Sequence, residues 1–195
     1  MKRIRTIALT GLLAAASLCA WAQQRGPAVD SHAPSQAAAD ILRDVANADG
    51  AFLAAGLVKE SFQSDDLSTL MQYPDDEIVV IGITGAQIRQ AFERSISLFP
   101  QPNTSMLQIS GFEVVFDPNA EPSKRIKRIS AGGSALDEGK TYNVAMPSSL
   151  GRGGLGYFKI WDKTKIVSTV AGTTVEKALA GKKLVQTSAR WVAER

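Results

Sequence analysis

The sequence predicts a single domain that combines helices with strands, and three patterns in its 195 residues support this. Apolar residues from Ala37 to Ala48 recur with the period of a helix. A β-branched run from Glu77 to Ile83 is typical of a buried strand. Directly after this run, Thr84 is placed to cap a second amphipathic helix that extends from Ala86 to Leu98.

The first 22 residues have the pattern of an export signal. A basic start precedes an Ala- and Leu-rich run that ends at Ala20-Trp21-Ala22, and this small-x-small sequence is typical of a cleavage site. We expect cleavage after Ala22 and no membrane span in the mature chain, because the apolar run is short for a bilayer. Cys19 raises the alternative of a lipid anchor, but Leu18 stands where that signal needs a small residue. The expected location is therefore the periplasm or the extracellular space.

Cleavage would also remove the basicity of the chain. The formal net charge is +3, and the signal holds three cations, Lys2, Arg3 and Arg5, and no acidic residue, so the mature chain is neutral. A neutral chain gives no support for nucleic acid or an anionic membrane as a partner. The one cysteine leaves with the signal, so the mature chain has neither a disulfide nor thiol chemistry.

After the signal we expect a short lead and one domain. Residues 23–36 are rich in Pro, Ala, Ser and Gly, which predicts a flexible lead that contains His32, the only histidine. Residues 37–195 form the domain. Loss of 22 of the 195 residues leaves 173, and a chain of this length buries roughly 70% of its unfolded surface without a disulfide.

The other elements follow in order along the chain. A short buried strand is expected from Ala51 to Ala55, and a short helix with an acidic first turn from Asp65 to Met71. A capping-box-like start at Thr173-Thr174 predicts a last helix, and a helical or strand-like segment covers Leu184 to Val192. Strand patterns also occur at 107–116 with an interruption at Ser110-Gly111, and at 125–131, 141–146, 157–161 and 166–170.

Three segments have a combined order and spacing that points to a known family. Ile83-Thr84-Gly85 opens a helix, the strand Leu107 to Gly111 follows, and Lys140 to Ala145 leads into the glycine loop Gly151 to Gly156 ahead of Tyr157. Together they resemble the C-terminal, substrate-recognising domain of the 5'-nucleotidase family, from about Ala37 to about Leu179. The resemblance implies an α+β fold, with a single domain of mixed β-sheet and flanking helices.

The same resemblance implies that this chain corresponds to half of an enzyme. In the family, the metal ions and the hydrolytic chemistry belong to a separate N-terminal metallophosphatase domain, of which the sequence shows no trace. A dinuclear centre needs several His, Asp and Asn ligands around two cations, and one histidine cannot supply them. We therefore expect no metal, no cofactor and no catalytic residue, and we expect His32 to do no chemistry.

A carboxylate-only metal site is the alternative, built from Asp65, Asp66, Asp75, Asp76 and Glu77. Such acidic clusters are more often the first turn of a helix or a solvated loop. Nucleophilic catalysis has no support either, because the mature chain has no cysteine, no Gly-x-Ser-x-Gly elbow and no histidine placed to activate a serine.

The glycine loop Gly151 to Gly156 matches the Gly-x-Gly-x-x-Gly pattern of dinucleotide-binding proteins, and Glu176 lies 20 residues beyond it. That pattern joins a strand to a helix. Because Tyr157 to Trp161 is expected to be a strand, we do not predict a dinucleotide site.

In the resembled family this loop has the form Gly-Gly-Asp-Gly-Tyr/Phe, in which the Asp contacts the nucleoside and an upstream aromatic stacks on its base. Here Leu155 stands at the position of the Asp and Ser149 at that of the aromatic. The family's second stacking ring, in Pro-Phe-Gly-Asn, is matched by Tyr73-Pro74-Asp75-Asp76, so Pro74 replaces the Phe and Tyr73 is a displaced candidate. The family's Asn-Gly-Gly-Gly-Ile-Arg corresponds to Ala54 to Lys59, and lysine lacks the planar fork of arginine.

The sequence thus keeps the parts of the resemblance that build the fold and loses most of those that hold a nucleotide. The candidates for replacement contacts are Tyr73, Arg152, Tyr157 and Phe158. The alternative is that Tyr157 and Phe158 pack in the core and that Arg152 is a solvated loop residue. The expected ligand-binding residues are Tyr73, Asp75, Asp76, Ser149, Arg152, Gly153, Gly154 and Tyr157.

Three functions fit these observations. The first is an exported, stand-alone domain, non-catalytic by itself, that binds a nucleotide-like small molecule or a protein partner in a cleft between residues 73–77 and 151–156. The second is the specificity subunit of a split nucleotidase or phosphoesterase of nucleotide catabolism, a 5'-nucleotidase-type hydrolase completed by a separate metallophosphatase chain. The third is a structural or envelope-interaction module that has lost its ligand.

Overall fold

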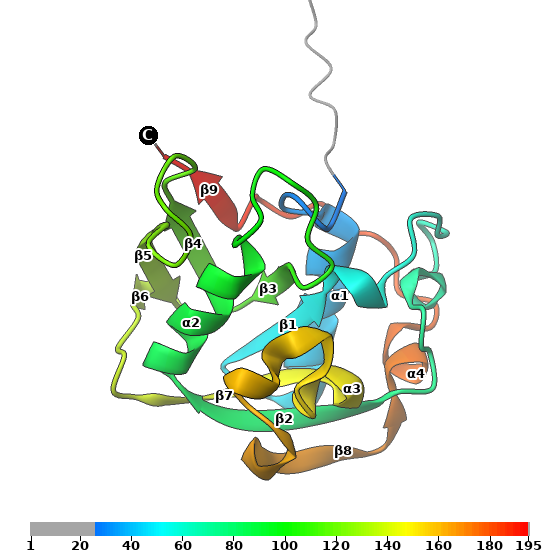
Figure 1. The fold of residues 1–195 in the computed structure, drawn as a ribbon. Coiled ribbons are helices and arrows are strands. Elements are labelled where there is room, and N and C mark those ends of the chain that lie inside the picture. Colours follow the sequence, from blue (N-terminus) through cyan, green and yellow to red (C-terminus); the bar gives the residue numbers. More distant parts are fainter. Residues whose placement is uncertain (1–25, 195) are drawn as a thin grey trace, which may run out of the picture.

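The computed structural model describes residues 26–194, so the expected signal at residues 1–22 lies outside the described part of the chain. The described residues fold into two β-sheets with helices packed around them (Figure 1). The larger sheet has the strand order β3-β1-β7-β2-β8, and the smaller has the order β6-β5-β4-β9. Both sheets mix parallel and antiparallel neighbours, which confirms the expected α+β fold.

The larger sheet brings together strands that are far apart in the sequence. β1 and β7 are parallel, and the other neighbouring pairs are antiparallel. The predicted strand from Glu77 to Ile83 is confirmed as β2, whose residues 78–81 are buried. The strands are β1 (Gly50–Ala54), β2 (Glu77–Thr84), β3 (Leu107–Ser110), β7 (Thr141–Pro147) and β8 (Ile166–Thr174).

The smaller sheet begins where the chain turns sharply out of β3. Gly111 has a φ of 79°, and a Cβ at this residue would lie 2.3 Å from the carbonyl oxygen of Asp49. Only glycine fits this turn, which explains the interruption expected at Ser110-Gly111. The strands that follow are β4 (Phe112–Phe116), β5 (Ile126–Ala131), β6 (Ser134–Ala135) and β9 (Trp191–Ala193).

Short helices connect the strands. The predicted N-cap of α2 is confirmed, because Thr84 Oγ1 accepts the Gln87 N–H at 3.2 Å and Gln87 Oε1 accepts the Thr84 N–H at 3.1 Å. The α-helices are α1 (Ala33–Ala46), α2 (Gly85–Ser95), α3 (Ser148–Gly151) and α4 (Val175–Leu179). The 3-10 helices are η1 (Ala55–Leu57), η2 (Leu67–Leu70), η3 (Gly154–Lys159) and η4 (Lys163–Lys165).

An aromatic cluster joins the two sheets in one core. The ring of Phe92 on α2 lies 5.5 Å from Phe52 of β1, 5.8 Å from Phe112 of β4 and 5.4 Å from Trp191 of β9, measured between ring centroids. Phe52, Phe92, Phe112 and Trp191 are buried. Helix α2 therefore packs against both sheets, and edge-to-face contacts of this kind stabilise the core beyond the area they bury.

Helix α1 begins four residues earlier than the sequence predicts, at Ala33 instead of Ala37, and it ends at Ala46 instead of Ala48. Pro34 occupies the first turn, where a missing N–H leaves no helical hydrogen bond unmade. Ser35 and Gln36 are buried. Residues 33–36 therefore belong to the folded domain and not to a flexible lead.

The expected strand from Tyr157 to Trp161 is wrong. The segment lies in η3 and the turn after it, and the Trp161 N–H donates to the Tyr157 carbonyl at 3.0 Å. Tyr157 and Trp161 are buried, whereas Phe158 and Lys159 between them are exposed. This four-residue spacing of buried residues is a helical period and not the alternation of a strand. The glycine loop starts inside α3 and not at a strand end, so it still lacks the dinucleotide-binding arrangement.

The C-terminal elements also differ in their bounds. Strand β8 extends to Thr174, whose Oγ1 accepts the Lys177 N–H at 3.3 Å and caps α4. The third helical residue is Lys177, so the reciprocal bond of a capping box is not made. Of the expected segment from Leu184 to Val192, only the end enters a strand, β9. No helix within residues 26–194 has the length and apolar character needed to cross a bilayer.

Candidate functional site

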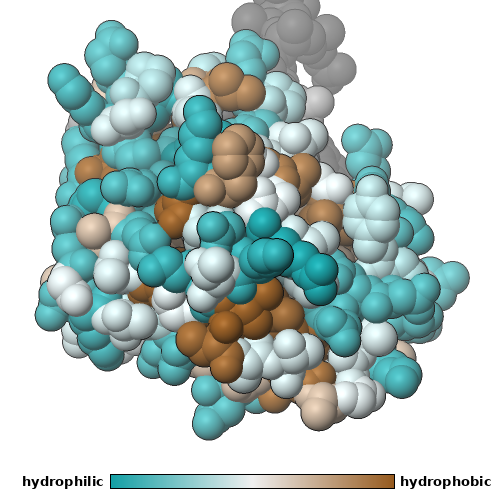
Figure 2. Space-filling view, turned by 60° about the horizontal axis from the view of Figure 1, so that its bottom comes forward, coloured by the Kyte–Doolittle hydropathy of each residue, from teal (hydrophilic) through white to brown (hydrophobic). Residues whose placement is uncertain are grey.

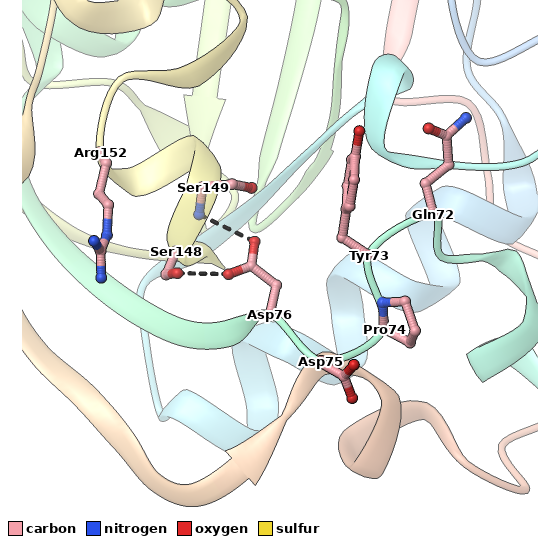
Figure 3. A pocket seen from close by; sticks show the side chains of 8 residues that line it. All are labelled: Gln72, Tyr73, Pro74, Asp75, Asp76, Ser148, Ser149 and Arg152. Atoms are coloured by element: carbon pink, nitrogen blue, oxygen red, sulfur yellow. Dashed lines mark hydrogen bonds between the residues drawn. The ribbon is translucent and has the colours of Figure 1, made fainter.

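A cleft of about 710 Å³ lies between the loop that precedes β2 and the helix that follows β7. We call it the main cleft. Strands β2 and β7 are antiparallel neighbours, and Ile78 pairs with Pro147, so the start of one strand lies beside the end of the other. This pairing brings two segments some 70 residues apart into contact. The cleft is lined by Gln72, Tyr73, Pro74, Asp75, Asp76, Ser148, Ser149 and Arg152 (Figure 3).

Asp76 fixes the two walls of the main cleft to each other. Its carboxylate accepts hydrogen bonds from the Ser148 hydroxyl and, at 3.0 Å, from the Ser149 N–H (Figure 3). Pro147, which precedes α3, makes no side-chain cap, so Asp76 serves as the acceptor at this helix terminus. Its backbone carbonyl also accepts the Val175 N–H at 2.8 Å and ties α4 to the same loop. Both carboxylate oxygens of Asp76 thus accept hydrogen bonds from within the protein.

Tyr73 lines the main cleft with an exposed aromatic ring. Its side chain is 58% exposed, and Ser149 points toward it from α3 (Figure 3). Tyr73 and Ser149 also line an adjoining space of about 240 Å³, which we call the inner cavity. The other residues of the inner cavity are Leu57, Leu150, Gly154 and Leu155. A ligand that enters both spaces would therefore pass the face of Tyr73.

The charged groups at the mouth of the main cleft are Asp75 and Arg152. Both residues are exposed. In Figure 3 the Asp75 carboxylate points away from Asp76, and the Arg152 guanidinium lies on the other side of α3 from Tyr73. An anionic group of a ligand therefore has one arginine available in this cleft, and a hydroxyl or cationic group has one carboxylate.

The prediction that Tyr157 contacts a ligand is corrected by its position. Tyr157 is fully buried, its ring stacks on that of Trp161 at 4.6 Å, and its hydroxyl donates to the Ser105 carbonyl. Burial raises the pKa of the Tyr157 hydroxyl well above its ordinary value. The alternative prediction, that Tyr157 packs in the core, is therefore confirmed. The same prediction is wrong for Phe158, whose side chain is 63% exposed.

The glycines of the loop have different positions. Gly154 lines the inner cavity, as expected for a ligand-contacting residue. Gly153 is buried, has a φ of 89°, and a Cβ there would lie 2.7 Å from the Phe158 Cα. Gly153 therefore shapes the turn and does not line either space.

Of the eight predicted site residues, Tyr73, Asp75, Asp76, Ser149 and Arg152 line the main cleft. Gln72, Ser148 and the three leucines of the inner cavity were not among the predicted ligand-binding residues. Leucines next to helical or strand-like segments resemble core residues, and only the tertiary structure shows which of them face a cavity. The position of Ser148 at the start of a helix could have been inferred from the sequence, since it immediately follows Pro147.

The acidic residues and the histidine form no metal centre in the described structure. Among residues 26–194, no group of three or more His, Cys, Asp or Glu side chains lies close enough to hold an ion. Asp66 accepts the Ser68 hydroxyl and N–H and caps η2, and these bonds lower the pKa of its carboxyl. His32 is half-buried, its Nδ1 lies 2.8 Å from Ser35 Oγ, and burial lowers its pKa.

Comparison with known proteins identifies the same domain type. A family model described as "5'-nucleotidase, C-terminal domain" matches residues 22–163. A snake venom 5'-nucleotidase of Naja atra is 35% identical over 89 residues, which are 42% of this chain and 17% of that protein. A trifunctional nucleotide phosphoesterase of Bacillus subtilis is 28% identical over 118 residues, which are 58% of this chain and 8% of that protein. The chain thus spans only a small part of the length of these relatives.

Solved structures share the fold. A 5'-nucleotidase precursor from Thermus thermophilus superposes with a TM-score of 0.71 at 19% identity, covering 85% of this chain and 36% of that chain. An NAD nucleotidase from Haemophilus influenzae gives a TM-score of 0.62 at 15% identity, covering 88% of this chain and 37% of that one. At such identities the likeness concerns the arrangement of the backbone.

Proposed function

The chain belongs to the 5'-nucleotidase C-terminal domain family, and from this premise we propose that it binds a small nucleoside- or nucleotide-like ligand in the main cleft. The observation that carries the proposal is the exposed ring of Tyr73, which lines both the main cleft and the inner cavity. The main cleft, at about 710 Å³, has the size of small-molecule sites, which measure roughly 300 to 1,000 Å³.

The lining supplies a specific set of ligand contacts. Tyr73 offers a face on which a flat ring stacks, and Ser149 offers a hydroxyl beside it. Arg152 attracts an anionic group at the mouth, and Asp75 accepts hydrogen bonds from ligand hydroxyls. Stacking on one aromatic ring stabilises a bound base by roughly 1 to 3 kcal/mol. One ring supports moderate affinity, and the remaining contacts decide which ligand is held.

A ligand screen tests this proposal. The mature chain is titrated with nucleosides, nucleotides and sugar phosphates, and thermal shifts are recorded with and without a divalent metal. We expect a shift for ligands that contain a flat ring, in the absence of metal. Melting temperatures that stay unchanged for every compound would contradict the proposal and favour a structural or envelope-interaction module.

The domain by itself is proposed to be non-catalytic. The sequence holds a single histidine, and a dinuclear phosphoesterase centre requires several nitrogen and oxygen donors on each ion. Purified chain supplied with Mn²⁺ or Zn²⁺ is expected to leave AMP, cyclic nucleotides and UDP-sugars intact. Turnover that rises in proportion to tightly bound metal would contradict this.

A second candidate function is that of a specificity subunit that acts with a separate metallophosphatase chain. The observation in its favour is that this chain covers 36% of the Thermus thermophilus 5'-nucleotidase precursor. Affinity purification from the native cell is expected to recover an exported metallophosphatase with this chain. Recovery of the chain alone, under conditions that preserve other complexes, counts against the second function.

The proposed site of action is outside the cytoplasm, in the periplasm or the extracellular space. The proposal is supported by the basic start, the apolar run and the Ala20-Trp21-Ala22 sequence of the first 22 residues. N-terminal sequencing of the protein from cell fractions is expected to give Gln23 as the first residue. A cytoplasmic protein that begins at Met1 would contradict it.

A further inference from the structure

Leu155 has a backbone conformation that leucine rarely adopts. Its φ and ψ are 53° and 27°, in the left-handed region. This region is disfavoured for a residue with a bulky side chain and is open to glycine or asparagine. The residues around it are Gly153, Gly154 and Gly156. Leu155 is therefore an unusual residue for its backbone conformation.

Two hydrogen bonds hold Leu155 in this conformation. Its carbonyl oxygen accepts Arg94 Nη2 at 2.6 Å and Ser105 Oγ at 2.8 Å. Gly156 leaves room for the arginine, because a Cβ there would lie 2.0 Å from Arg94 Nη2. A strained backbone persists only where the surrounding structure fixes it, and such positions are frequent at binding sites.

The conformation places the Leu155 side chain at the inner cavity. Leu57 and Leu150 line the same cavity, together with Tyr73, Ser149 and Gly154. Two of these six residues, Tyr73 and Ser149, have a side-chain hydroxyl, and none has a charge. Three of the six lining residues are therefore leucines, and the exposed Tyr73 lines the same cavity.

We propose that Leu155 is a specificity-determining residue, and that the inner cavity selects ligands whose inserted ring carries no amino or carbonyl substituent on its inner edge. This inference rests on the proposed function and specifies its ligand class: a flat ring stacks on Tyr73 and turns an edge without such substituents toward the leucines. A ring that carries amino or carbonyl groups on that edge loses its bonds to water there. Since the leucines offer no replacement partners, such a ring binds less tightly.

A series of ribosides that share one sugar tests the inference, because only the ring edge varies. The probes are purine riboside, adenosine and guanosine, each titrated into the mature chain by calorimetry. We expect purine riboside to bind at least about tenfold more tightly than guanosine, with adenosine between them. Equal affinities, or tighter binding of guanosine, overturn the inference while leaving the proposed function intact. If none of the three ribosides binds, the inference fails; the proposed function fails with it only when the nucleotides of the ligand screen do not bind either.

Replacement of Leu155 shows whether the preference resides in this side chain. The Leu155→Asn variant is expected to fold, because asparagine tolerates the left-handed conformation. It adds an amide to the cavity wall, so the preference for purine riboside over guanosine is expected to fall to about threefold or less. Leu98→Asn is the matched control, because Leu98 is an exposed leucine that lines neither space.

The control is expected to keep the full preference. A Leu155→Asn protein with an unchanged preference overturns the inference and assigns Leu155 to packing alone. A preference lost equally in both variants overturns it as well, because the effect would not depend on the cavity.

Discussion

Tyr73 is a large, exposed aromatic side chain at the junction of two cavities. Single exposed apolar residues are common on protein surfaces, and what distinguishes Tyr73 is that it lines both cavities. It lies in the loop before β2, and its side chain is 58% exposed, so it is accessible to a ligand. At the scale of single residues, the account of binding depends on this ring.

Removal of the Tyr73 ring is expected to weaken ligand binding without unfolding the protein. Loss of one stacking contact costs roughly 1 to 3 kcal/mol, or about 5- to 150-fold in affinity. Calorimetry with the best ligand of the screen compares Tyr73→Ala with Phe158→Ala. Phe158 is the matched control, because it is 63% exposed and lines neither cavity. Equal losses in both variants would place the ligand elsewhere.

His32 makes stability depend on pH in a defined direction. Burial lowers its pKa below the ordinary value of 6.5, so the unfolded chain takes up a proton at a higher pH than the folded chain. The stabilising contribution is therefore complete above pH 6.5 and is lost as pH falls toward and through the folded-state pKa. We expect the free energy of unfolding to drop more between pH 7.5 and 5 in the natural protein than in His32→Asn. Parallel urea-unfolding curves for the two proteins at both pH values would refute the effect.

The positions of five predicted site residues could be inferred from the family resemblance: Tyr73, Asp75 and Asp76 immediately precede β2, and Ser149 and Arg152 follow the end of β7. Their contact with a ligand stays a prediction. The burial of Tyr157 could not be predicted from the sequence, because tyrosine occurs both in cores and at binding sites. Here Ser105 and Ser95, distant in sequence, supply the partners that make its burial possible.

At the scale of elements, helix α3 depends on a residue outside itself. The four-residue helix has no side-chain cap from Pro147, and Asp76 supplies the acceptor from the neighbouring strand loop. The geometry of the main cleft therefore depends on this single carboxylate.

The Asp76→Ala variant is expected to lose about 1 to 2 kcal/mol of stability, which is the usual cost of removing a helix cap. Ligand affinity should also fall, because Ser149 and Arg152 lose their fixed place relative to Tyr73. Chemical denaturation and calorimetry measure the two effects. Asp75→Ala is the control for charge in the denaturation measurement alone, since Asp75 is exposed and its carboxylate points away from Asp76 (Figure 3). A similar loss of stability in both variants would show that Asp76 has no special role.

Elements with strong local signals were predictable. Strand β2 has a β-branched run, and helix α2 has an N-cap and a reciprocal glutamine. The error at Tyr157 to Trp161 arose because a short apolar segment fits a strand and a helical turn equally well. The left-handed residues Leu155 and Gly156 decide between them, and this conformation depends on Arg94, about 60 positions earlier.

At the scale of the whole molecule, the two sheets and α2 share one aromatic core, and the main cleft lies between the loop before β2 and helix α3. Figure 2 shows hydrophobic side chains gathered among hydrophilic ones on the face that Figure 1 presents at its bottom. The sheet order β3-β1-β7-β2-β8 could not be derived from local patterns, because it pairs residues as far apart as Glu77 and Thr174. The family resemblance predicted a mixed sheet with flanking helices, and the fold agrees with that prediction, but the order of the strands comes from the structure alone.

The claim on which the account depends is that the cleft beside Tyr73 holds a ring-containing small molecule without the aid of metal. Calorimetric titration of the metal-free mature chain with purine riboside tests it most directly. The account predicts saturable binding with one site per chain, weakened at least about fivefold by Tyr73→Ala and unchanged by Phe158→Ala. Binding that is absent without metal, or that is indifferent to the Tyr73 ring, would contradict it.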